Sequence, residues 1–260
     1  MRATKIIIMG VLAAASWIVD WLLLKEVIYQ NQTIIFVGWP SLATILGITF
    51  LTFFFLINRN RVVSLILDII IVGAYMLIMP MVPIVLIGGG IFLVFLQLFE
   101  QRLAHEEKSR TDFSIRRVMS GSITLTVYGL LLLIGLNVYY NTQVDFKANP
   151  DFYYDKVAVA ATKTVPYVTK NIKELSDEQK RELSHKVASD VVDRIKVSAA
   201  GYQEYFPFLF AIIVTGTLLT FAFLLRWAAM IVAFLIFRFL LFIKFFKLHK
   251  VPVEVEKLEV

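Results

Sequence analysis

The 260-residue chain contains no cysteine. This absence excludes disulfides, thiolate nucleophiles and metal sites built on cysteine. Histidine is scarce as well: the chain has three, His105, His185 and His249, on three separate polar segments. Haem and metal sites need ligands that converge, and these three residues share no ligand spacing. We therefore expect no bound metal and no cofactor.

Motifs of enzymes and nucleotide-binding proteins are missing too. The glycine run at 88–90 lacks the lysine that follows in a phosphate-binding loop, and it falls inside an apolar block. Intramembrane proteolysis needs a serine with a histidine in the membrane, two histidines on one helix, or two aspartates that meet. The apolar blocks hold no histidine, and Asp20 and Asp68 are expected near opposite faces. Catalysis is the function that the sequence favours least.

Charged residues are few, at 18% of the chain, and the net excess of +6 forms no basic patch with interleaved aromatic residues. The longest polar segment, residues 139–205, carries ten Lys and Arg against ten Asp and Glu, so its net charge is zero. The positive excess therefore lies in the other loops and tails, where membrane orientation explains it. We expect no binding of nucleic acid.

Hydrophobic residues make up 58% of the chain and gather in blocks long enough to cross a bilayer. The sequence thus predicts an all-α polytopic membrane protein with six transmembrane helices, a seventh being possible. Five spans occupy the membrane region 1–138, at about 6–24, 34–57, 62–79, 84–99 and 118–138. The third and fourth come from one apolar stretch, which Pro80 and Pro83 divide by a tight turn.

The orientation follows from the short basic loops. Arg59 and Arg61 follow the second span and residues 100–117 hold five more basic residues, so both loops and the N-terminus are predicted to be cytoplasmic. Counting crossings then places 139–205 outside. The aromatic residues expected at the outer interface are Trp17, Trp21, Tyr29, Trp39, Tyr139, Tyr140, Tyr202 and Tyr205. Bulky residues near position 20 also disfavour a cleaved signal peptide, whose cleavage site needs small residues.

The C-terminal block, residues 206–247, leaves more than one arrangement open. Residues 206–225 form the sixth span, and 227–247 are apolar enough for a seventh, but this stretch contains Arg238 and ends in lysines that a crossing would export. We prefer a helix at the cytoplasmic interface, followed by a cytoplasmic tail at 248–260. One long, tilted sixth helix is a further alternative, because no Gly or Pro interrupts 217–251.

The polar segment 139–205 is predicted to be a small extracytoplasmic helical insert between spans five and six. Within it, residues 176–196 form a helix, because Ser176 and Gln179 have the spacing of a capping box. One face of this helix is apolar and consists of Leu183, Val187, Val191 and Ile195. This candidate interaction face either packs on residues 152–172 or leaves part of its surface for a partner.

Two aspartates interrupt the apolar blocks and are candidate functional residues. Asp68 is predicted about two turns inside the third span, where an ionisable group is costly enough to suggest a function. The structural interpretation, which we favour, is an ion pair near the cytoplasmic face with Arg61, or with Arg116 or Arg117. Asp20 is predicted one turn from the outer end of the first span, where interfacial water would hydrate it.

Glycines inside the spans indicate close helix packing rather than a pore. Gly88, Gly89 and Gly90 lie in the fourth span, and Gly121 and Gly129 in the fifth. Small residues between membrane helices let the two backbones approach. We expect neighbouring helices to pack directly against them.

Taken together, these features favour an integral membrane scaffold or assembly subunit. It would sit in the lipid bilayer and contact a protein partner, or a second copy of the chain, through the insert. The alternative is a small-solute or ion transporter or channel subunit that uses Asp68. A transporter should line a midplane cavity with polar groups, whereas the span centres are almost purely apolar in sequence. The scaffold is therefore the favoured function.

Overall fold

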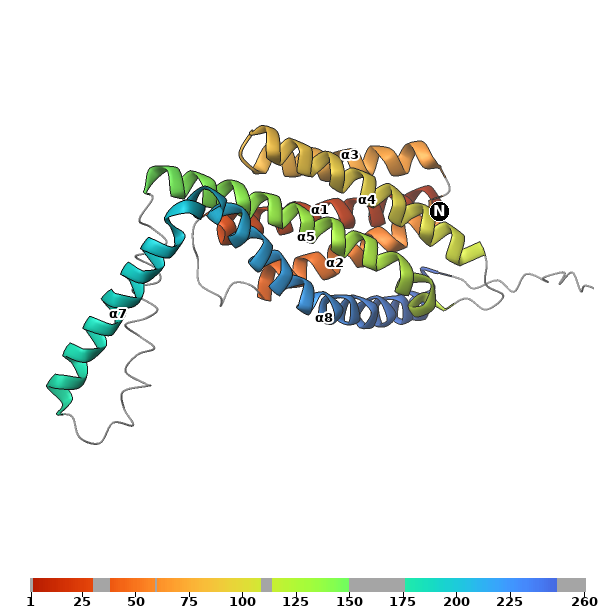
Figure 1. Cartoon of the computed structure of the whole chain (residues 1–260). Coiled ribbons are helices and arrows are strands. Elements are labelled where there is room, and N and C mark those ends of the chain that lie inside the picture. The colour runs from red at the N-terminus through yellow and green to blue at the C-terminus, as the bar shows by residue number, and fades with distance from the viewer. Residues whose placement is uncertain (1, 30–37, 59, 109–113, 150–175, 247–260) are drawn as a thin grey trace, which may run out of the picture. The chain divides into compact units, whose positions relative to one another are not determined.

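The computed structural model describes residues 2–29, 38–58, 60–108, 114–149 and 176–246. These residues form helices and no strand (Figure 1). Six helices are long and apolar enough to cross a membrane, which confirms the predicted all-α class and the number of candidate spans. They are α1 (Arg2–Tyr29), α2 (Gly38–Ile57), α3 (Arg61–Ile78), α4 (Pro83–Lys108), α5 (Ile115–Ala148) and α8 (Phe206–Phe242). The polar helix α7 (Asp177–Ala199) and the 3-10 helix η2 (Ala200–Tyr205) precede α8.

The chain forms two compact units. The first unit comprises Met1–Asn137 and Thr215–Val260, and the second comprises Val138–Val214. In the first unit α1 packs extensively along α2, and α3 packs against both α4 and α1. Both α5 and α8 contribute residues to each unit.

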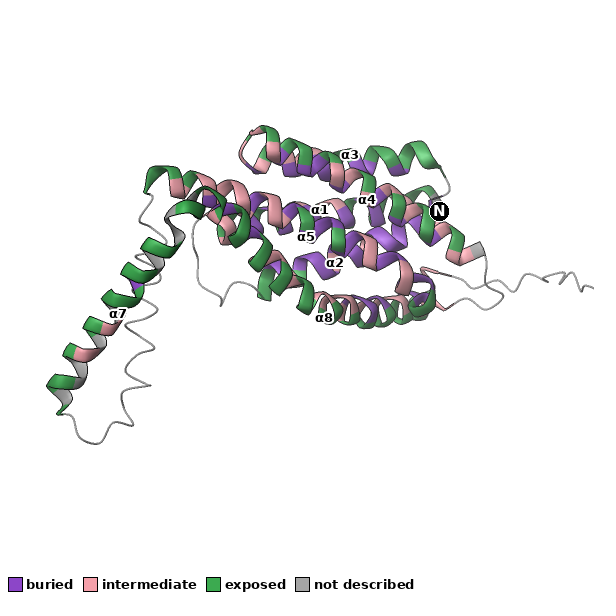
Figure 2. Cartoon of the chain, in the orientation of Figure 1, coloured by how far each residue is buried: buried purple, intermediate pink, exposed green. Residues whose placement is uncertain are grey.

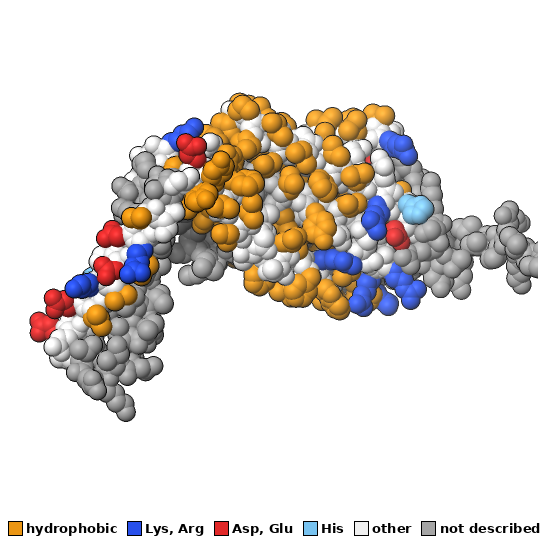
Figure 3. Space-filling model, in the orientation of Figure 1, with side chains coloured by type: hydrophobic (Ala, Val, Ile, Leu, Met, Phe, Trp, Pro, Cys, Tyr) orange, Lys and Arg blue, Asp and Glu red, His pale blue; other side chains and the backbone are white. Residues whose placement is uncertain are grey.

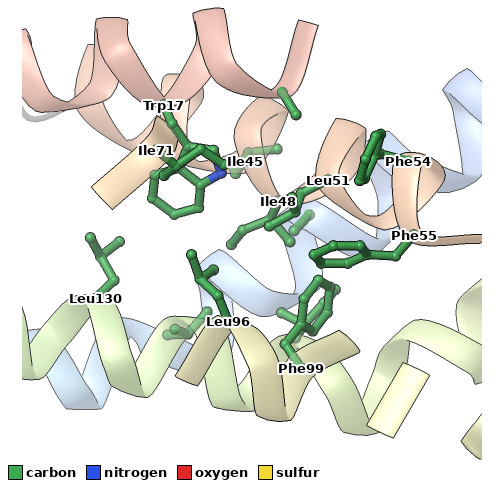
Figure 4. Close-up of a cluster of buried hydrophobic side chains, with 14 of the residues drawn as sticks. Trp17, Ile45, Ile48, Leu51, Phe54, Phe55, Ile71, Leu96, Phe99 and Leu130 are labelled. Atoms are coloured by element: carbon green, nitrogen blue, oxygen red, sulfur yellow. The ribbon is translucent and has the colours of Figure 1, made fainter. Parts of the chain in front are cut away.

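One apolar core holds the first unit together. Trp17 of α1, Ile48 and Phe55 of α2, Leu96 of α4 and Leu130 of α5 are all buried in it (Figure 4). Buried residues lie on the sides of the helices that face one another, and exposed residues lie on the outside (Figure 2). In the most apolar stretches of α2 and α5, 67% of the residues are buried, whereas in that of α8 only 6% are. Helix α2 therefore lies within the core, and α8 presents most of its apolar surface outward.

The turns explain where α3 and α4 begin and end. Asn60 caps α3, because its side-chain oxygen accepts a hydrogen bond of 2.9 Å from the backbone N–H of Val62. Helix α3 ends before Met79, which is extended because it precedes Pro80. Pro83 then opens α4 at a position where a helix does not use the missing N–H. The predicted tight turn between the third and fourth spans is confirmed.

Two helices continue past the predicted spans. Helix α4 runs through residues 100–108 of the polar loop, and α5 runs ten residues beyond position 138 into the predicted insert. Helical periodicity does not require apolar side chains, so a drop in hydropathy marks the edge of an apolar block and not the end of its helix.

Helix α8 is the largest departure from the predicted boundaries. It continues without interruption from Phe206 to Phe242, so no helix boundary lies between the sixth span and residues 227–242. The structure has the single long helix that the sequence left as an alternative. The helical path stops at Lys244, whose φ of 57° is left-handed, and the N–H of Phe245 bonds to the carbonyl of Leu240 at 2.8 Å. The position of 227–242 relative to a membrane stays a prediction.

Glycines admit close neighbours at several helix crossings. A Cβ atom at Gly129 of α5 would lie 2.7 Å from the Cβ of Phe95 on α4. One at Gly89 would lie 2.8 Å from the Cε of Met76, whereas at Gly90 nothing lies within 4 Å. The close-packing prediction therefore holds at Gly129 and Gly89 but not at Gly90.

Candidate functional site

Asp68 lies near the middle of α3, seven residues after Arg61 and ten before Ile78. At 1.5 Å per residue, this is about 10 Å from the start of the helix. Its side chain is fully buried, on the same helix face as Ser64. The predicted position of this carboxylate is near the cytoplasmic face, whereas in the 18-residue helix α3 it lies close to the centre.

Gln97 of α4 is the hydrogen-bond partner of Asp68. Its Nε2 amide donates to Asp68 Oδ2, while Oδ1 has no hydrogen-bond partner among the described residues. The predicted ion pair between Asp68 and an arginine is wrong in the described part of the chain. Arg61 interacts electrostatically with Glu100 instead, and no described cation interacts with Asp68. A buried carboxylate with one free oxygen is an open acceptor.

Glu100 brings a second carboxylate to the same helix contact. It lies one turn after Gln97 on α4, is half-buried, and accepts a hydrogen bond from the hydroxyl of Ser64. Ser64 in turn lies one turn before Asp68 on α3. The charge of Glu100 also acts on Asp68. Two acidic groups and one arginine therefore share this contact, with more negative than positive charge when both carboxylates are ionised.

The turn between α2 and α3 extends this set of polar groups. The Nδ2 amide of Asn58 donates to Ser64 Oγ at 3.0 Å and to the carbonyl of Asn60 at 2.9 Å. We call the resulting set the polar row: Asn58, Arg61, Ser64, Asp68, Gln97 and Glu100. Gln97 and Glu100 are not among the residues predicted to contact Asp68. The signal in the sequence is their spacing. Gln97 and Glu100 are three residues apart and so share one helix face, as Ser64 and Asp68 do at a spacing of four.

Asp20 is buried at a different contact, between α1 and α2. The hydroxyl of Thr44 donates to Asp20 Oδ2 at 2.8 Å, and Asp20 Oδ1 has no hydrogen-bond partner among the described residues. The side chain is fully inaccessible to solvent. The predicted hydration at the membrane interface is wrong, because α1 continues nine residues beyond Asp20, to Tyr29, and α2 packs along it.

The two tryptophans beside Asp20 are interior residues as well. Trp17 and Trp21 are fully buried, with ring centroids 5.1 Å apart. Trp21 Nε1 donates to the carbonyl of Ile71 on α3 at 3.1 Å. Gly47 of α2 lies against Trp17, and a Cβ there would be 3.1 Å from its Nε1. The prediction that both tryptophans belong to an outer aromatic belt is therefore wrong.

A third polar contact joins α1, α3 and α5. The hydroxyl of Tyr29 donates to Asn137 Oδ1 at 2.8 Å, and Asn137 Nδ2 donates to the Tyr75 hydroxyl at 2.7 Å. Asn137 and Tyr75 are fully buried. With the polar row and the Asp20–Thr44 pair, the core of the first unit holds polar groups in three places. Because Asp68 lies near the middle of α3, the expectation of almost purely apolar span centres does not hold at that position.

The predicted interaction face lies on α7, in the second unit. The capping box that starts this helix is confirmed: the N–H of Ser176 donates to Gln179 Oε1 at 3.0 Å, and the N–H of Gln179 donates to Ser176 Oγ at 3.3 Å. Val191 is 37% exposed, and Leu183 and Val187 are half-buried. The side chain of Ile195 and the predicted covering segment 152–172 lie outside the described residues.

Within the described ranges, no three His, Asp or Glu side chains are placed to hold a metal ion. The polar row therefore offers single carboxylates rather than a ready chelate. An open carboxylate oxygen beside an amide and a second acid can accept a proton or contribute to binding one small cation.

Comparison with protein-family models, curated proteins and solved structures finds no significant match to this chain.

Proposed function

We propose that this chain moves a small cation, protons included, across a cell membrane, with Asp68 as the group that takes it up and releases it. The observation that carries this proposal is the state of the Asp68 carboxylate. It is fully buried near the middle of α3, bound through one oxygen to Gln97, and open at the other. Ionisable groups at such a depth are costly and mark ion pathways or proton relays in membrane proteins.

The rest of the polar row supports the same function. Ser64 and Glu100 lie one turn from Asp68 and Gln97, toward the α2–α3 turn, and Arg61 stands at the start of α3. The polar row therefore extends from an exposed arginine to a buried carboxylate. The apolar sequence of the span centres favours a scaffold, whereas the buried Asp68 near the middle of α3 favours transport.

The orientation predicted from the basic loops completes the proposal. With the N-terminus inside, the α2–α3 turn faces the cytoplasm, and so does the end of the polar row that holds Arg61. Residues between α5 and α8 would then form an extracytoplasmic insert. The membrane would be crossed by all six apolar helices, with the C-terminus cytoplasmic.

Flux measurements in liposomes test the proposal. The full chain is reconstituted with an internal dye for protons or for sodium, and a potassium diffusion potential is applied. We expect faster uptake of one of the two cations than in protein-free liposomes. Asp68→Asn should return the rate to the protein-free level, because an amide can still accept from Gln97 but cannot carry a charge.

Asp190→Asn is the matched control, since Asp190 is an exposed carboxylate on α7. Asp190→Asn should leave the rate of cation uptake unchanged. Both Asp68→Asn and Asp190→Asn should have the elution volume and the melting temperature of the wild type. Wild-type liposomes no faster than empty ones with either dye, or an Asp68→Asn variant as fast as the wild type, would refute the proposal.

A scaffold or assembly subunit is the second candidate, and α7 favours it. This helix leaves Val191 exposed on its predicted interaction face. If the face binds a protein partner or a second copy, Val191→Asp should abolish the association in mild detergent, and Val197→Asp, at an 80% exposed position on the same helix, should not. The scaffold also predicts that Asp68→Asn leaves the association intact, whereas transport predicts that Val191→Asp leaves the flux intact.

A further inference from the structure

Three arginines lie at or beside the contact between the start of α5 and the middle of α8, in the first unit. Arg116 and Arg117 are exposed in the first turn of α5. The Cζ atom of Arg116 lies 5.2 Å from the centre of the Trp227 ring on α8. Arg226 immediately precedes Trp227 and is half-buried. We call Arg116, Arg117, Arg226 and Trp227 the α5–α8 basic site.

One buried donor of this site lacks an acceptor in the described part of the protein. The first turn of α5 contains no acidic residue. Arg226 Nε is buried and has no hydrogen-bond partner there. A buried donor without an acceptor is unfavourable, and the N-terminus of a helix adds a partial positive charge. An anion with several oxygens would satisfy these donors, because guanidinium groups match phosphate geometry.

The surface around the basic site is apolar. On the turns of α8 before and after Trp227, the exposed large side chains include Phe223 at 60%, Leu224 at 51% and Ile231 at 51%. Lys and Arg side chains gather at one end of the first unit, directly beside a broad hydrophobic surface (Figure 3). A tryptophan between guanidinium groups and an apolar surface is typical of the level of lipid headgroups.

We propose that the α5–α8 basic site binds the phosphate headgroup of an anionic phospholipid, whose acyl chains lie along the exposed side of α8. The arginines select the phosphate, and the apolar side chains of α8 select a ligand that carries hydrocarbon. A free phosphate ion would use only the first of these two features. The predicted orientation agrees, since it turns this end of the bundle toward the cytoplasmic leaflet, where anionic lipids attract clustered basic residues.

Native mass spectrometry of the full chain tests this proposal. The protein is delipidated in detergent and mixed with equal amounts of phosphatidylglycerol and phosphatidylcholine that have identical acyl chains. We expect the wild type to retain phosphatidylglycerol with a preference of about tenfold. The double variant Arg116→Gln/Arg226→Gln should lose most of this preference. Inorganic phosphate at the same concentration should not displace the lipid.

Arg238→Gln is the matched control. Arg238 is the exposed arginine of α8, and its Cζ lies 5.3 Å from the Phe234 ring, but it belongs to a different turn than Arg226. This variant should keep the preference, because general attraction to charge is not the mechanism. Equal retention of both lipids by the wild type would overturn the proposal whether or not the double variant folds. Equal losses in the control and the double variant, or displacement by inorganic phosphate, would overturn it too.

Discussion

The amide of Gln97 donates a hydrogen bond to the carboxylate of Asp68 across the contact between α4 and α3. This single bond is all that the described protein offers a fully buried acid, since the other oxygen of Asp68 has no partner there. Glu100 lies one turn away and adds a second acidic group rather than a cation. The unpartnered oxygen of Asp68 is the feature on which the proposed cation transport depends.

The first prediction concerns the coupling of Gln97 to Asp68. Gln97→Leu leaves the carboxylate with no partner and should lower the free energy of unfolding by about 1–3 kcal/mol. The double variant Asp68→Leu/Gln97→Leu should lose less free energy of unfolding than the sum of the losses of the two single variants, because an apolar pair leaves no polar group unpaired. Unfolding in mixed micelles measures the free energy of the single and double variants. Gln101→Leu, at an exposed position of α4, is the control, and additive losses would show that the two residues are not coupled.

The second prediction concerns the Asp20–Thr44 pair. Thr44→Val removes the hydroxyl that donates to Asp20, so the free energy of unfolding should fall by about 1–3 kcal/mol. Thr49 provides the control on the same helix, because its hydroxyl is buried and has no hydrogen-bond partner in the described residues. Thr49→Val should be neutral or stabilising. If the two variants melt at the same temperature, the bond to Asp20 contributes nothing.

The third prediction concerns the crossing of α5 and α4. Gly129→Ala would place a methyl group 2.7 Å from the Cβ of Phe95, so the helices must separate and the free energy of unfolding should fall by about 1–3 kcal/mol. Gly90→Ala meets no atom within 4 Å and should stabilise α4 by about 0.5–1 kcal/mol. Thermal unfolding in detergent compares them. A Gly129→Ala variant as stable as Gly90→Ala would contradict the close approach.

The fourth prediction concerns topology. The chain has no cysteine, so a single introduced thiol reports its own side of the membrane without background. Ser184→Cys should react with an impermeant maleimide in intact cells, and Ser109→Cys should react only after permeabilisation. A reporter fused after Val260 should be cytoplasmic. Labelling at position 109 but not at 184 would reverse the orientation, and an external reporter would mean that residues 227–247 cross the membrane.

Local features of the fold could be predicted from the sequence because neighbouring residues decide them. The prolines at 80 and 83 divide one apolar stretch into α3 and α4, since Pro80 forces Met79 out of the helix. Ser176 and Gln179 start α7 by bonding to each other's backbone. The end of α8 could not be predicted, because a lysine takes the left-handed conformation that usually falls to glycine.

The class of this protein follows from its amino-acid sequence alone, because blocks of apolar residues long enough to span a bilayer allow an all-α membrane protein and little else. The surroundings of its polar side chains depend on how the helices pack. Lipid is as apolar as a protein core, so hydropathy does not tell which side of a membrane helix faces a neighbour. Trp17 and Asp20 are therefore predicted at the membrane interface but are buried in the protein. Asp68 bonds to Gln97, 29 residues away, rather than to Arg61 on its own helix.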